Sequence, residues 1–197
     1  MSRVQDLSIP RRGAMGDAPG LIGGLTVWTP ILSGHDAELE AVLEAMPDGS
    51  DSPAARIEWT HLARWLIVPQ LVHQGAPMKA DGLASPYLVF TAAFDGSKED
   101  YVEALRTRLA AECDAIWSHC VGYPGSGDAD AFARYLRHNE LRNRLFISTY
   151  PDATVAEIRA GLELKQKLLA FAVRAQAMEP DELQHTFLEL FPAEASA

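Results

Sequence analysis

The chain has 197 residues, of which 48% are hydrophobic and 22% are charged, and its formal net charge is −10 at pH 7. These values are typical of a globular protein with one domain and an extension, and the negative charge disfavours nonspecific binding to nucleic acid or to an anionic membrane. No apolar run approaches the ~20 residues of a membrane-spanning helix, and the N-terminus has no signal-peptide pattern. We therefore expect a cytoplasmic protein with no nucleic-acid or membrane partner.

The two cysteines agree with a reducing compartment. Cys113 and Cys120 lie seven residues apart in a segment with helical periodicity. This spacing places them roughly 10 Å apart along a helix, too far for a disulfide bond. Free cysteines are typical of cytoplasmic proteins.

The two ends of the chain lack the patterning of its middle. The first 20 residues contain five prolines and glycines and little hydrophobic periodicity, which predicts a flexible arm over residues 1–20. A single folded domain with a C-terminal helical extension is expected over residues 21–192, followed by a tail over residues 193–197.

Between these ends, hydrophobic periodicity and turn residues predict the elements in chain order. Strands are expected over residues 25–32, 56–68, 87–94 and 145–150. Helices are expected over residues 36–46, 97–120, 129–138, 154–178 and 181–190. Without the helix over 129–138, this order is the split βαβ pattern, β-α-β-β-α-β. We therefore predict an α+β, ferredoxin-like fold with a four-stranded antiparallel sheet, helices on one face, an inserted helix and C-terminal helices.

This order of elements over residues 25–178 resembles that of the dimeric α+β barrel superfamily. The resemblance implies that two copies pair through the open faces of their sheets as a homodimer, and that a ligand lies between sheet and helices. The superfamily includes cofactor-free monooxygenases, small-molecule isomerases, haem-degrading enzymes and haem peroxidases. It therefore implies action on a small apolar or aromatic molecule, with haem as a candidate cofactor.

Two polar residues stand out in the apolar run over residues 59–68. A buried strand rarely carries a His and an Arg unless they are paired or functional, which makes His61 and Arg64 candidate site residues. Alternation places them on opposite faces of the strand unless a β-bulge intervenes. His61 suits a general base or haem ligand, or else a histidine hydrogen-bonded across the sheet or at a dimer interface. Arg64 suits an anchor for a carboxylate or peroxide, or else a structural pair with Asp95 or with an acidic residue of a partner.

Asp95 and His119 are the outer candidates. Asp95 lies where the third strand turns into a helix, so it is either an active carboxylate or an extra cap of that helix. His119 ends a helix, where the helix dipole favours a protonated imidazole. A metal site is expected only if the fold brings His119 to His61 or His138, because no HxH, HxxxH or CxxC spacing indicates zinc. We therefore predict no metal site from the spacing.

A local basic cluster interrupts this acidic chain. Its members are Arg134, Arg137, His138, Arg142 and Arg144. The cluster is either a solvated helix face and loop or a site for an anionic ligand.

Two classes of function remain open. The first is an enzyme of the oxygenase- or peroxidase-like oxidoreductase kind, in which His61, Arg64, Asp95 and His119 are the candidate catalytic residues. The second is a noncatalytic ligand-binding or accessory dimerisation protein that uses the same cavity or the same sheet surface.

Overall fold

The computed structural model describes residues 22–72, 75–77 and 82–191. The arm predicted over residues 1–20 and the tail predicted over residues 193–197 lie outside these ranges. The chain divides into two compact units, of which the first ends at Val155 and the second begins at Ala156.

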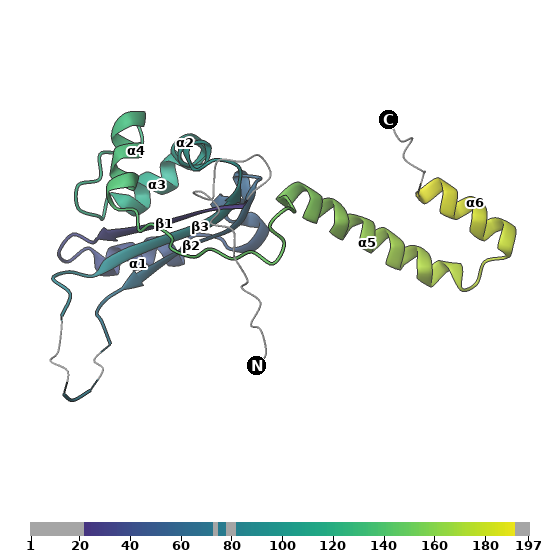
Figure 1. Cartoon of the computed structure of the whole chain (residues 1–197), viewed down its shortest axis with the longest axis horizontal. Coiled ribbons are helices and arrows are strands. Elements are labelled where there is room, and N and C mark those ends of the chain that lie inside the picture. Colours follow the sequence, from purple (N-terminus) through teal and green to yellow (C-terminus); the bar gives the residue numbers. More distant parts are fainter. Residues whose placement is uncertain (1–21, 73–74, 78–81, 192–197) are drawn as a thin grey trace, which may run out of the picture. The chain divides into compact units, whose positions relative to one another are not determined.

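The first unit is built on a three-stranded antiparallel sheet. Its strands are β1 (Ile22–Pro30), β2 (Thr60–Val68) and β3 (Tyr87–Asp95), in the order β1-β3-β2. Because β1 and β2 both run antiparallel to β3, they are parallel to each other with β3 between them (Figure 1). The alternating apolar residues that predicted these strands point into the core from every second position.

The prediction of a four-stranded ferredoxin-like sheet is wrong, although the fold is α+β. Residues 145–150 form no strand, and the side chains of Leu145 and Ile147 are 79% and 78% exposed. The chain follows the edge of β1 only briefly, where Leu141 N–H donates to the carbonyl of Thr26 at 2.9 Å. It then leaves the edge because the ring of Phe146 packs over the face of β1 at a glycine, Gly24.

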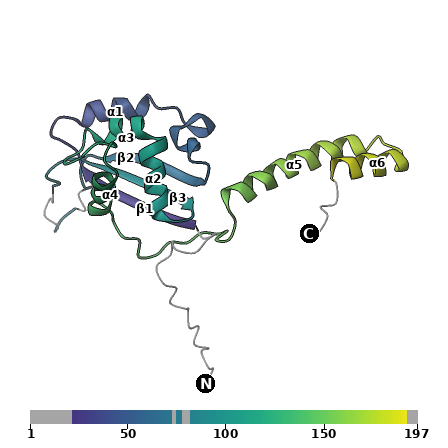
Figure 2. The same cartoon turned by 90° about the horizontal axis from the view of Figure 1, so that it is seen from above.

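Four helices cover one face of the sheet. They are α1 (Asp36–Glu44), α2 (Lys98–Arg108), α3 (Ala110–Trp117) and α4 (Ala129–His138), and two 3-10 helices, η1 (Gly49–Asp51) and η2 (Pro53–Arg56), precede β2. Figure 2 shows α1–α4 in front of the strands. The helix predicted over 97–120 is two helices, because the backbone at Leu109 departs from helical geometry.

The core lies between this helical layer and the sheet. Phe90 and Phe94 of β3 are fully buried, and Phe94 stacks on Tyr101 of α2 with ring centroids 4.0 Å apart. Trp117 of α3 packs edge-on against Phe90 at 5.6 Å. Large aromatic side chains contribute several kcal/mol each when fully buried, so this cluster anchors α2 and α3 to the sheet.

A partly buried carboxylate holds the glycine-rich loop between α3 and α4. Asp114 accepts hydrogen bonds from the Tyr123 hydroxyl at 2.7 Å, from Ser126 N–H at 2.8 Å and from the Ser126 hydroxyl at 2.7 Å. Burial alone would raise the pKa of Asp114, but these hydrogen bonds outweigh it and hold the pKa below its usual value. The loop is therefore fixed to α3 at its middle.

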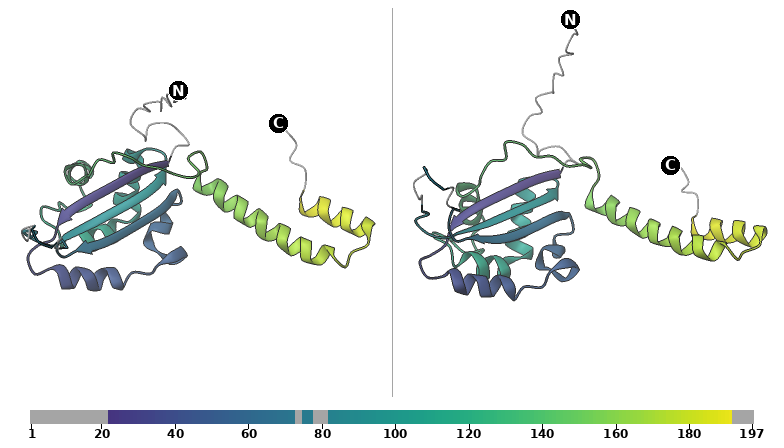
Figure 3. Two further views of the ribbon diagram at one scale, coloured as in Figure 1. Left: turned by 60° about the horizontal axis from the view of Figure 1, so that its bottom comes forward. Right: turned by 90° about the horizontal axis from the view of Figure 1, so that it is seen from below.

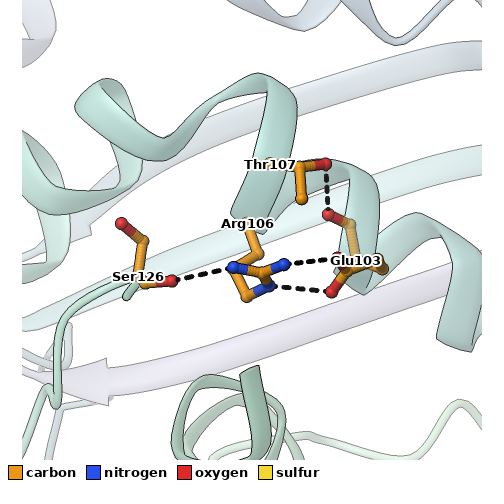
Figure 4. Close-up of polar contacts among 4 residues, drawn as sticks. All are labelled: Glu103, Arg106, Thr107 and Ser126. Carbon is orange, nitrogen blue, oxygen red and sulfur yellow. Dashed lines mark hydrogen bonds and ion pairs between the residues drawn. The ribbon is translucent and has the colours of Figure 1, made fainter. Parts of the chain in front are cut away.

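Arg106 of α2 fastens the same loop from the other side. Its guanidinium donates to both carboxylate oxygens of Glu103, at 2.8 and 2.5 Å, and to the carbonyl of Ser126 at 3.3 Å (Figure 4). The ion pair holds the pKa of Glu103 below its usual value, mainly through these hydrogen bonds.

The second unit is a pair of helices. Helix α5 (Val155–Ala175) begins at the last residue of the first unit, and α6 (Pro180–Leu190) follows it. Phe171 contacts Phe187 and Phe191, with ring centroids 5.7 and 5.8 Å apart. None of the helices in the described ranges is both long enough and apolar enough to cross a membrane.

Candidate functional site

The structure pairs two of the predicted residues, His61 and Asp95. His61 Nε2 lies 2.7 Å from Asp95 Oδ1, and both side chains are largely buried. The other oxygen of Asp95 accepts a hydrogen bond from Val155 N–H at 2.8 Å. Asp95 therefore ties the end of β3 to the start of β2 and to the first residue of α5.

A β-bulge explains how His61 reaches Asp95. Thr60 is paired with Phe94 but Leu62 with Ala93, so His61 is the extra residue on β2. Asp95 shares its face of β3 with Thr91 by alternation, and Thr91 Oγ1 accepts a hydrogen bond from Arg64 Nε at 3.1 Å. The β-bulge therefore changes the expected alternation, and His61 and Arg64 lie on the same face of the sheet.

This pair has the features of a structural link. A hollow beside it is lined by Asp95, Trp59 and Arg108, and not by His61. Arg108 lies over the Trp59 ring at 4.6 Å and closes one side of that hollow. Both oxygens of Asp95 already accept hydrogen bonds from other parts of the chain. The pair therefore links β2, β3 and the first residue of α5, and has no free acceptor oxygen for acid–base chemistry.

His119 lies at the opposite end of the sheet. The carbonyl of His119 accepts a hydrogen bond from Leu32 N–H, just beyond the last residue of β1, whereas Asp95 is paired with Ile22 at its first residue. The nine residues of β1 place these ends roughly 26 Å apart. The four predicted residues therefore do not form one site.

His119 instead meets two residues that were not predicted, His35 and Glu38. His35 Nδ1 lies 3.1 Å from His119 Nδ1. Glu38 Oε2 lies 3.7 Å from His35 Nδ1 and 3.8 Å from His119 Nδ1. One ligand atom from each residue falls within 4.8 Å of the others.

Local structure explains this convergence. His35 precedes the first residue of α1, and Glu38 lies in the first turn of that helix, three residues later, so both project from the same face. His119 follows α3 and is fixed through its carbonyl to Leu32. The side chain of His119 is 16% exposed, that of His35 42% and that of Glu38 69%, so the cluster opens to solvent on the Glu38 side.

These distances suit a first-row transition metal. Two atoms bound at 2.0–2.1 Å to a tetrahedral zinc ion are roughly 3.3 Å apart, close to the separation of the two imidazole nitrogens. Glu38 would have to approach by only a few tenths of an ångström, which an exposed side chain reaches by a rotamer adjustment. For this contact to be a hydrogen bond, one of the two nitrogens donates and the other accepts.

The neighbouring thiol does not belong to this ligand set. Burial raises the pKa of Cys120, whose Sγ accepts a hydrogen bond from the Thr29 hydroxyl at 3.4 Å. Cys113 is likewise buried, and burial raises the pKa of its thiol. Both cysteines are free, as predicted.

One local signal for the cluster was present in the sequence. A histidine followed three residues later by a glutamate, at the start of a helix, places two ligand types on one face. The third ligand is 84 residues away, and only the pairing of the segment after α3 with the segment after β1 brings it close.

No protein-family model, curated protein or solved structure matches this chain. The resemblance to the dimeric α+β barrel superfamily therefore stays a prediction, without its fourth strand.

Proposed function

We propose that the protein binds a single divalent transition-metal ion through His35 Nδ1, His119 Nδ1 and Glu38 Oε2. The observation that carries this proposal is the convergence of three ligand atoms within 4.8 Å, from two segments that are far apart in the chain. Imidazole suits zinc, copper, iron and nickel, and a carboxylate completes a mixed nitrogen and oxygen set.

The ligand set leaves room for chemistry at the metal. Two histidines and one carboxylate hold zinc in hydrolytic sites with a fourth position open to water. The same set holds non-haem iron(II) in oxygenases, again with open positions. The solvent-facing side of the cluster, at Glu38, gives a small molecule access to those positions.

The proposed metal site changes where we expect the oxidoreductase activity to take place. In our proposal the reactive centre lies at His119 and not at His61, which is occupied by Asp95. An iron-loaded centre would act as an oxygenase, whereas a zinc-loaded centre would act on bonds open to hydrolysis. The metal content of the purified protein decides between these two reactions.

Cobalt binding tests the metal site directly. Tag-free protein, stripped of metal, is titrated with Co(II), and visible absorption reports coordination. We expect one ion per chain, competition by zinc, and affinities reduced by ~100-fold or more in His35→Asn and His119→Asn, because each removes a ligand.

The control variant is His185→Asn in α6. His185 is exposed and lies 3.3 Å from Glu189, so it offers a His–Glu pair without the second histidine. Equal cobalt binding by wild type, His119→Asn and His185→Asn would contradict the proposal.

The sheet face opposite helices α1–α4 bears on the predicted homodimer. Figure 3 shows this face without a helix of the first unit over it. Val89 is paired across the sheet with Trp28 on one side and Leu66 on the other, which gives the face an apolar row. Pairing of two such faces remains a prediction, and the molar mass in solution measured by light scattering tests it.

A further inference from the structure

A shallow hollow of about 720 Å³ lies beside the end of β1, between α4 and the loop that precedes it. Its cationic side comes from α4, and its apolar side from the loop and from the α4 residue Tyr135. The principal lining residues are Arg134, Arg137, His138, Val121, Pro124 and Tyr135. The hollow therefore combines cations with an apolar wall.

The arginines of this hollow have no acidic partner among the described residues. Two cations of the first unit do have acidic partners: Lys98 lies 2.5 Å from Glu140, and Arg106 lies 2.5 Å from Glu103. Other arginines of this unit, such as Arg64 and Arg108, also lack an acidic partner among the described residues, so the concave position of Arg134 and Arg137 is what sets them apart. Arg134 and Arg137 make no such pair within the described ranges, although the chain carries a net charge of −10. Unpaired guanidinium groups in a concave surface attract anions.

The hollow and the metal cluster adjoin along the same edge of β1. Asn139 is hydrogen-bonded to Trp28, Val121 to Pro30, and His119 to Leu32. Pro30 and Leu32 are two residues apart, about 6.6 Å along the chain. Ile31 and Cys120, which lie between these bonds, are buried and form an isolated bridge; of the residues on either side of Cys120, Val121 is exposed and His119 is 16% exposed.

We propose that this hollow holds the anionic group of the small molecule that reacts at the metal. The part of this inference that concerns reaction at the metal rests on the proposed metal site, whereas anion binding in the hollow does not. The ligand class is a carboxylate or phosphate ester on an apolar or aromatic body, because guanidinium forks match both oxyanions and the remaining wall is apolar.

The probes are two aromatic anions, benzoate and phenyl phosphate. Benzyl alcohol is the control without a charge, and inorganic phosphate is the control without an apolar body. Calorimetry on the metal-free full chain measures binding to the hollow. We expect both aromatic anions to bind more tightly than either comparison compound. The double variant Arg134→Gln/Arg137→Gln should lower their affinity by ~10-fold or more, since hydrogen bonds to charged groups are lost.

The matched control is Arg142→Gln/Arg144→Gln, which removes the same charge from exposed positions outside the hollow. This control should retain the affinity to within about twofold at physiological salt, because distant surface charges are screened. Equal losses in the two double variants, or no loss in either, would overturn the inference.

Cobalt-loaded protein tests the link to the metal. Benzoate should change the visible absorption of cobalt in wild type and not in Arg134→Gln/Arg137→Gln, which still binds cobalt. An unchanged spectrum with benzoate bound would overturn the link. Failure of the wild type to bind cobalt would instead contradict the metal site itself, and calorimetry on the metal-free chain would report separately on the hollow.

Discussion

The two ends of β1 carry two clusters of similar composition and different character. At one end, His61 and Asp95 form a closed pair, in which the carboxylate also accepts Val155 N–H. At the other end, two imidazoles converge with the carboxylate of Glu38, which has no further ion-pair partner among the residues that the structure describes. The comparison shows that a histidine next to a carboxylate is not in itself a site. What distinguishes the two clusters is whether the carboxylate oxygens already accept hydrogen bonds from other parts of the chain.

The largest expected difference concerns zinc and stability. Zinc at 100 times its dissociation constant should raise the free energy of unfolding by about 2.7 kcal/mol, because only the folded state presents the site. His61→Asn should keep this increment and His119→Asn should lose it. Urea unfolding with and without zinc measures both. The reverse result would show that His61 binds the metal and that His119 does not.

Asp95→Ala should come next and act on stability alone. The substitution leaves Val155 N–H and His61 without their acceptor, at a cost of about 2–3 kcal/mol in the free energy of unfolding. Cobalt affinity should be unchanged, because the metal end is remote. Asp152→Ala, at an exposed position nearby, is the control and should change neither quantity. A loss of cobalt binding in Asp95→Ala would show that the two ends are coupled.

Asp114→Asn should have a smaller effect that depends on pH. An amide keeps one acceptor oxygen but loses charge-assisted bonds from Tyr123 and Ser126, which costs about 1–2 kcal/mol. Because the folded pKa of Asp114 is lowered, its ionised form stabilises the protein in full above the unfolded pKa of about 3.9. This contribution is lost as pH falls through the folded pKa. Urea unfolding of both proteins from pH 7 downward should therefore show their difference shrinking below about pH 4. A constant difference would mean that the carboxylate charge is not what holds the loop.

Arg64→Ala should have the smallest effect. Its guanidinium is exposed and makes one hydrogen bond, to Thr91, so the free energy of unfolding should change by less than about 0.5 kcal/mol. A larger loss, accompanied by a fall in molar mass, would show that the sheet face opposite helices α1–α4 is an interface between copies of the chain.

Alternation and capping predicted the three strands and most helix positions, because each element carries its own periodicity. The segment 145–150 has the same alternation and forms no strand, since pairing depends on the neighbouring edge and Phe146 packs over Gly24 instead. Periodicity also misses the single extra residue at His61. The partners of His119 were not predictable, because no local pattern encodes a contact across 84 residues.

The contact between Gly24 and Phe146 has a consequence for how this sequence tolerates change. A methyl group on Gly24 would lie 2.9 Å from the Phe146 ring, so alanine there is overpacked while the ring stays in place. In a library randomised at both positions and selected for folding, larger residues at 24 should survive only with smaller ones at 146. The residues at positions 24 and 146 would then covary among the selected sequences.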